Sequence, residues 1–175
     1  MKNNILFTPH FALLEFTESP TAKKHGIVNT PPDEAVENLK RLCQGTLEPL
    51  REALGLPVII TSGYRCKALN DILANASRTS QHMKGQAADF YVGWGTKLSR
   101  HGQSGCTPTA RERLIQAFRL ILTSEKVDFD QLILYPNFIH VSYVSPKANR
   151  HSIMIAESSG KYRSVSFKTA LNYQL

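Results

Sequence analysis

The stretch SQHMKGQAAD, residues 80–89, carries the most selective pattern in this sequence. His82 and Asp89 flank six residues, and Gly85 among them allows the chain to turn sharply without a side-chain clash. The residues after the glycine are expected to form a strand, whose side chains alternate between two faces. Ala87 shares a face with Asp89 and is small enough to leave room beside the carboxylate. An imidazole on the turn and a carboxylate on the strand can therefore converge on one point.

A third ligand for a metal ion is available in a second predicted strand. His140 lies in the run FIHVS, residues 138–142. A histidine within an apolar strand is more often a hydrogen-bonded core residue, but here two further donors are already expected nearby. Two histidines and one carboxylate form a common catalytic zinc set that leaves a fourth position for water, whereas four protein ligands would indicate a structural site. The other histidines lie in loop-like segments and are not expected to be ligands: His10, His25, His101 and His151.

The segment before this stretch predicts a long amphipathic helix. Residues 31–54 carry an apolar stripe that recurs mostly every three or four positions. Thr30 is the expected N-cap, Gly55 the expected end, and Pro49 is expected to kink the helix or to split it in two. The polar stretch 17–34 that leads into this helix is expected to be a loop.

The remaining elements predict an α+β fold. Short strands are expected at 58–62, 86–92, 129–134 and 138–144, a short helix at 67–76, a helix capped by Thr107 and Pro108, and one or two strands in the tail 151–168. The turn YPN joins the third and fourth of these strands into a hairpin. This order predicts one domain over residues 1–175 with a mostly antiparallel sheet. The polar stretch 94–109 is expected to be either a pocket lid or a plain surface loop.

Composition and charge narrow the classes of function without selecting one. The net charge of +7 fits attraction to a polyanion as well as simple solubility. Lys23 and Lys24 are the nearest approach to a basic cluster, so nucleic-acid binding is not expected. No run approaches the roughly 20 apolar residues that a membrane span needs. Three widely spaced cysteines form no CxxC pair and are expected to be reduced thiols: Cys43, Cys66 and Cys106.

The motif around residues 80–89 resembles a known family. The pattern SxHxxGxAxD is similar to that of the zinc D-Ala-D-Ala peptidases, which include carboxypeptidases, dipeptidases and phage endolysins that cut L-alanyl-D-glutamate bonds. Residues 61–66, TSGYRC, resemble the SGYR element of that family, and residues 138–142 resemble its closing strand. The likeness runs over most of residues 6–145 and matches the short single-domain members found in bacteria and phages.

The resemblance implies a fold and a set of roles. The fold would be the Hedgehog/DD-peptidase type, with a small antiparallel sheet that carries one zinc ion on His82, Asp89 and His140. Arg65 would bind the substrate carboxylate or polarise the scissile carbonyl, for which a bidentate guanidinium is suited; the alternative is a surface salt bridge. Three further residues are candidates for substrate contact, although the first two could instead shape the loop or pack: Ser80, Tyr64 and Asn137.

One position departs from the family pattern. The carboxylate that takes the proton of the attacking water commonly stands three residues before the last histidine, where this chain has Asn137. Asparagine cannot accept a proton at neutral pH, so this departure affects catalysis more than metal binding. Asp130, with Asp128 nearby, is the closest upstream carboxylate and is the candidate general base. The alternative is that Asp130 caps the strand or the turn.

Two functions are therefore expected from the sequence. The first is a monomeric zinc peptidase that cuts peptidoglycan peptides, as a D-Ala-D-Ala carboxypeptidase or an L-Ala-D-Glu-type endopeptidase. The second is a non-catalytic zinc module that binds cell-wall peptides. Residues 1–16 lack the continuous apolar segment and cleavage site of a signal peptide. We therefore expect cytoplasmic synthesis and delivery to the wall by other means, as for a phage lysin.

Overall fold

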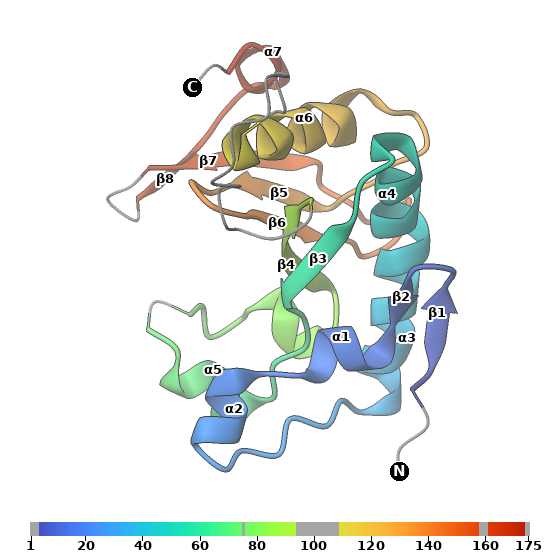
Figure 1. The fold of residues 1–175 in the computed structure, drawn as a ribbon. Helices are drawn as coiled ribbons and strands as arrows, with labels where there is room; N and C mark the ends of the chain where they lie inside the picture. Colours follow the sequence, from blue (N-terminus) through green and yellow to red (C-terminus); the bar gives the residue numbers. More distant parts are fainter. Residues whose placement is uncertain (1–3, 75, 94–108, 158–160, 174–175) are drawn as a thin grey trace, which may run out of the picture.

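A six-stranded sheet forms the centre of the computed structural model, which describes residues 4–74, 76–93, 109–157 and 161–173 (Figure 1). Its strands, in spatial order, are β3 (Val58–Ser62), β4 (Ala87–Val92), β6 (Ile139–Ser142), β5 (Gln131–Leu134), β7 (Ser152–Ala156) and β8 (Tyr162–Ser164). All neighbouring pairs are antiparallel except β5 and β7, which are parallel. The predicted α+β class with a mostly antiparallel sheet is confirmed, as are the hairpin β5–β6 and two strands in the tail.

The long predicted helix is a continuous rod with a change of winding in its middle. It comprises α3 (Asp33–Leu42), the π-helical turn η1 (Cys43–Leu47) and α4 (Glu48–Leu54). Pro49 has no N–H to donate to the carbonyl of Gly45. The backbone N–H of Asp128 donates to that carbonyl instead, at 3.0 Å. The break expected at Pro49 is therefore a π-turn, and it connects the rod to the segment before β5.

The two ends of this rod follow different rules. Gly55 ends it in the left-handed conformation, with φ of 62°, as predicted. The prediction of Thr30 as N-cap is wrong, because Pro32 occupies that position and Asp33 is the first helical residue. A proline disfavours helical backbone at the residue before it. Pro32 therefore keeps Pro31 extended, and the helix starts later than predicted.

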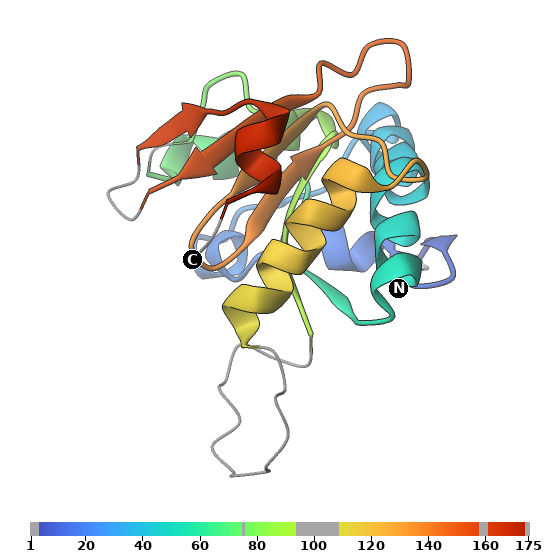
Figure 2. The ribbon, with the colours of Figure 1, turned by 90° about the horizontal axis from the view of Figure 1, so that it is seen from above.

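Helix α6 (Ala110–Thr123) covers one face of the sheet (Figure 2). Its N-cap is Thr109, whose hydroxyl accepts from the N–H of Glu112 while the Glu112 carboxylate accepts from the Thr109 N–H. The predicted cap at Thr107 and Pro108 is wrong, because the capping box places the cap at Thr109, three residues before Glu112. Thr107 and Pro108 lie outside the described residues, as does the predicted loop 94–109 except for Thr109. The helix buries its apolar stripe: Leu114, Ile115, Ala117, Phe118 and Ile121.

Several short elements complete the described chain. Strands β1 (Leu6–Thr8) and β2 (Phe11–Ala12) form a small hairpin before the helices α1 (Leu13–Thr17) and α2 (Pro20–Lys24). Helix α2 corrects the predicted loop 17–34, because the Ser19 hydroxyl accepts from the Ala22 N–H and caps it. The remaining helices are α5 (Lys67–Ile72), shorter than the predicted 67–76, the 3-10 helix η2 (Gln81–Lys84) and the unpredicted α7 (Phe167–Leu171). None of the helices within the described ranges combines the length and apolarity that a membrane crossing requires.

The two faces of the sheet have different characters. The side chains of Ala88, Phe90, Ile139, Val141, Leu132 and Leu134 are fully buried and belong to the hydrophobic core. Because side chains alternate along a strand, the residues between them point to the opposite face. That opposite face carries Asp89 and His140, so the core holds the two strands on which these candidate ligands stand.

Candidate metal centre

Three elements bring the candidate ligands together. Strands β4 and β6 pair Asp89 directly with His140, and the short helix η2 presents His82 to both. Gly85 ends η2 with φ of 68°, and a Cβ built there would lie 2.2 Å from the carbonyl oxygen of Ala35 in α3. Only glycine therefore fits this close approach of η2 to the long helix. The role expected for this glycine in the turn is confirmed.

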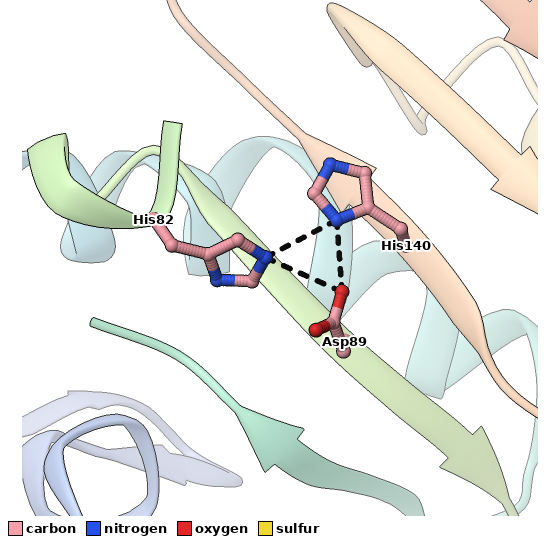
Figure 3. Close-up of side chains that lie close together, drawn as sticks. All are labelled: His82, Asp89 and His140. Carbon is pink, nitrogen blue, oxygen red and sulfur yellow. Dashed lines mark hydrogen bonds and ion pairs between the residues drawn. The ribbon is translucent and has the colours of Figure 1, made fainter. Parts of the chain in front are cut away.

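The ligand atoms form a closed triangle (Figure 3). The Nδ1 atom of His140 lies 2.8 Å from Oδ1 of Asp89, the Nε2 atom of His82 lies 3.3 Å from the same oxygen, and the two nitrogens are 3.2 Å apart. Zinc bonds of about 2.0–2.1 Å at tetrahedral angles place ligand atoms roughly 3.3 Å from one another. The donor set and its spacing therefore fit one zinc ion without large movement of any side chain.

His82 is held in the form that a metal requires. Its Nδ1 atom lies 2.7 Å from the carbonyl oxygen of Gly63, which can only accept, so Nδ1 carries the proton and Nε2 keeps its lone pair. The side chain is 3% exposed, and this burial lowers the pKa of His82 despite the neighbouring Asp89 carboxylate. The imidazole is therefore neutral at physiological pH and available as a ligand.

Asp89 is held as a carboxylate. Burial alone would raise its pKa, but the interactions with the imidazoles of His82 and His140 outweigh burial and lower the pKa well below its usual range. Its second oxygen, Oδ2, accepts from Nη2 of Arg65 at 2.7 Å. One oxygen is thus paired with a cation of the protein, and the other faces the two imidazoles.

Arg65 contacts a candidate ligand and the strand beside it. Besides its pair with Asp89, its Nε atom donates to the Ser62 hydroxyl at 2.9 Å, and its backbone N–H donates to the His82 carbonyl at 3.2 Å. The side chain is 15% exposed, so the expected alternative of a surface salt bridge is corrected to a largely buried one. These contacts orient the carboxylate toward the triangle.

Asp130, the candidate general base, is fully engaged away from the triangle. Arg150 donates to its Oδ1 from the backbone N–H and from Nε, at 2.9 and 2.8 Å, and Nη2 of the same arginine pairs with Oδ2. Gln81 and Ser142 also donate to Oδ2, at 2.9 and 3.3 Å. Burial opposes ionisation, yet these hydrogen bonds lower the pKa of Asp130 to about 2. A carboxylate with this pKa and these donors is a weak base, which favours the structural alternative.

The three remaining candidates lie in different environments. Tyr64 is 7% exposed and belongs to the hydrophobic core, and this burial favours its packing role. Ser80 is partly exposed at the start of η2, where its carbonyl accepts from the Met83 N–H and shapes the turn. Asn137 is exposed in the β5–β6 turn. The sequence did not identify Gln81 and Arg150 as partners of Asp130. Both lie far from Asp130 along the chain, and no sequence pattern predicts that they meet it.

Comparison with known proteins gives one match. A family model described as Peptidase M15 matches residues 9–142, which is more than half of the chain and includes the whole triangle. No curated protein sequence matches the chain.

Proposed function

The chain belongs to the peptidase M15 family, a family of metallopeptidases, and we propose that it hydrolyses peptide bonds in cell-wall peptidoglycan with one zinc ion bound by His82, Asp89 and His140. The proposal treats the whole chain, residues 1–175, as one such domain. The bond cut would be of the D-Ala-D-Ala carboxypeptidase type or the L-Ala-D-Glu endopeptidase type. The observation that carries the proposal is the triangle of two imidazole nitrogens and one carboxylate oxygen, with edges of 2.8, 3.2 and 3.3 Å.

The protein groups around the triangle prepare it for this chemistry. When bound, zinc supplies an acidified water and polarises the scissile carbonyl. The Gly63 carbonyl fixes the tautomer of His82, so that its lone pair is not lost to a proton. Arg65 takes up one oxygen of Asp89 and leaves the other for the metal. Three protein ligands leave at least one coordination position for water or substrate.

The identity of the proton acceptor separates two candidate functions. Asn137 has no basic group, and Asp130 is bound by Arg150, Gln81 and Ser142. A missing general base costs about 10²–10⁴ in rate. The first candidate is therefore a slow peptidase. The second candidate is a zinc-containing module that binds cell-wall peptides without cutting them, and the lack of a free carboxylate at Asn137 and Asp130 favours it.

Hydrolysis by the purified protein tests the proposal. Peptidoglycan and synthetic stem peptides are incubated with the full chain and zinc, and the masses of the products identify the bond. We expect cutting that stops with a chelator and in His82→Ala, whereas His25→Ala, a matched change of an exposed histidine, retains it. Activity that survives both chelator and His82→Ala would contradict the zinc peptidase.

A single substitution distinguishes the peptidase from the binding module. If the wild-type chain binds zinc and stem peptide but releases no product, and Asn137→Asp gains hydrolysis, the binding module is supported. If the wild-type chain cuts and Asn137→Asp accelerates it, the slow peptidase is supported. The zinc content of both proteins is measured by mass spectrometry. Equal zinc content means that a difference in hydrolysis reflects proton transfer and not metal binding.

A further inference from the structure

A row of aromatic side chains lies beside the metal triangle, on the same face of the sheet. Leu134 pairs with Ile139 and both are fully buried in the core, so the next pair along the hairpin, Tyr135 and Phe138, points to the opposite face. That is the face of His140, which lies two residues from Phe138 on the same chain. Two residues of strand span about 7 Å, so this pair is adjacent to the triangle.

The first two rings of the row are stacked on each other and leave their edges and outer faces for a ligand. The rings of Tyr135 and Phe138 stack with centroids 4.3 Å apart and planes inclined by 11°. The backbone N–H of Tyr135 donates to the carbonyl of Phe138 at 3.0 Å and closes the turn. From α6, Nη1 of Arg111 donates to the carbonyls of Tyr135 and Pro136, at 2.6 and 3.1 Å. The turn is thus fixed at both its ends, and the rings need little ordering when a ligand binds.

The sheet register extends the row to the edge strand. Strand β5 runs parallel to β7 with Leu134 beside Ile155, which places Tyr135 beside Ala156. Ala156 in turn pairs with Tyr162 on β8. A small residue therefore separates Tyr135 from Tyr162, and Tyr162 is 58% exposed. We name Phe138, Tyr135 and Tyr162 the aromatic row.

Electrostatics agree with this placement. Burial raises the pKa of the Tyr135 phenol, and the Asp89 carboxylate and the Tyr162 phenol raise it further, while Arg65 lowers it. The strand order places Tyr135, at the end of β5, between Asp89 in β4 and Tyr162 in β8, which agrees with the direction of these two interactions. The aromatic row is therefore continuous with the metal triangle.

We propose that the aromatic row binds an amino-sugar ring of the peptidoglycan glycan strand to which the stem peptide is attached. This inference rests on the proposed function. Aromatic faces carry negative potential and attract the weakly positive C–H groups of a flat surface. Stem peptides offer mainly small or charged side chains, whereas a pyranose ring offers such a surface. The phenols of Tyr135 and Tyr162 can also bond to sugar hydroxyls and amides.

The aromatic row extends from the triangle across the sheet. Phe138 lies two residues from His140, about 7 Å along β6. Tyr162 lies on β8, three strand spacings from β6, or about 14 Å across the sheet. Because an extended peptide advances about 3.3–3.6 Å per residue, a sugar ring bound on the row lies within the length of a stem peptide of the triangle.

Binding of a sugar without peptide tests the row independently of catalysis. The disaccharide N-acetylglucosamine–N-acetylmuramic acid is titrated into the full chain by calorimetry. We expect saturable binding that weakens at least tenfold in Tyr162→Ala and persists in Tyr162→Phe. Phe167→Ala is the matched control, since Phe167 is 50% exposed on α7, which packs against α6 and β7. Absence of saturable binding, or equal weakening by Phe167→Ala, would overturn the inference.

Kinetics separate the failure of this inference from the failure of the proposed function. The ratio of kcat/KM for a disaccharide-linked L-Ala-D-Glu peptide to that for the free peptide is measured in wild type and in Tyr162→Ala. We expect a ratio above ten that falls toward one in the variant. A ratio near one in wild type, with hydrolysis present, would overturn the row and leave the peptidase intact. Disaccharide binding without any hydrolysis would retain the row and refute the peptidase.

Discussion

Asp89 in β4 and Asp130, directly before β5, are two buried carboxylates that differ in what their oxygens contact. Asp89 gives one oxygen to Arg65 and turns the other to two imidazoles, whereas both oxygens of Asp130 accept hydrogen bonds from Arg150 and its neighbours. The first arrangement leaves an oxygen for a metal ion, and the second leaves none. Burial and a lowered pKa are common to both groups, so the pattern of partners, and not the ionisation state, separates the candidate ligand from the structural anchor.

The largest expected effect follows from removing the ligand carboxylate. Asp89→Ala should lower zinc affinity by at least about a thousandfold, well beyond the 10–100-fold loss typical of an outer-shell partner. The loss arises because two imidazoles remain where three donors stood. Competition with a fluorescent chelator measures it, and Asp71→Ala, which removes a half-exposed carboxylate of a surface pair, serves as control. Zinc affinity that stays within tenfold of wild type would show that Asp89 is no ligand.

Removing the anchor carboxylate should have a different result. Asp130→Ala leaves donors of Gln81, Ser142 and Arg150 without their acceptor, and we expect a loss of about 3 kcal/mol in the free energy of unfolding. The value lies at the low end for a buried pair because Arg150 is largely exposed and water can take up its charge. Urea denaturation measures this loss. If zinc affinity instead collapsed at unchanged stability, Asp130 would belong with the ligands.

Acid should weaken the anchor through the same group. The pKa of Asp130 is lowered from 3.8 to about 2 in the folded chain, so the folded state favours the carboxylate. Its stabilising contribution is complete above pH 4 and is lost as the pH falls toward 2, by about 2 kcal/mol. Denaturation of the metal-free chain at several pH values should show this decline, and Asp130→Asn should lack it. Equal declines in both proteins would assign the acid sensitivity to other carboxyls.

The smallest expected effect concerns the cation beside the ligand. Arg65→Lys keeps the positive charge but loses the planar fork that joins Asp89 and Ser62. We expect zinc affinity to fall about tenfold, at the lower end for an outer-shell partner. The chelator competition used for Asp89→Ala measures it. A loss as large as that of Asp89→Ala would mean that the guanidinium, and not the ligand set, determines metal binding.

The sequence was sufficient to group the candidate ligands because the spacing of two of them is local. His82, Gly85 and Asp89 lie within one turn and one strand, and alternation along the strand predicts the shared face. His140 could be added because a two-His, one-carboxylate set is a common zinc site. The α+β class followed from the order of the elements, and the two strands of the tail were also predicted.

The sequence was insufficient where contacts join distant segments. Asp130 meets Arg150 only because β5 and β7 pair in parallel, and the row from Phe138 to Tyr162 exists only in that register. Local competition explains the other differences: Pro32 displaced the predicted cap Thr30, and Ser19 started a short helix within a predicted loop. The salt bridge of Arg65 was anticipated as an alternative, but its burial depended on the fold.

A crystal structure of the zinc-loaded chain, with anomalous scattering recorded at the zinc edge, tests the central claim most directly. The expected result is one peak about 2.0–2.2 Å from Nε2 of His82, Oδ1 of Asp89 and Nδ1 of His140, with Asp130 still paired to Arg150. A peak bound by a different set of residues, or three side chains that do not share a peak at full zinc occupancy in solution, would contradict it.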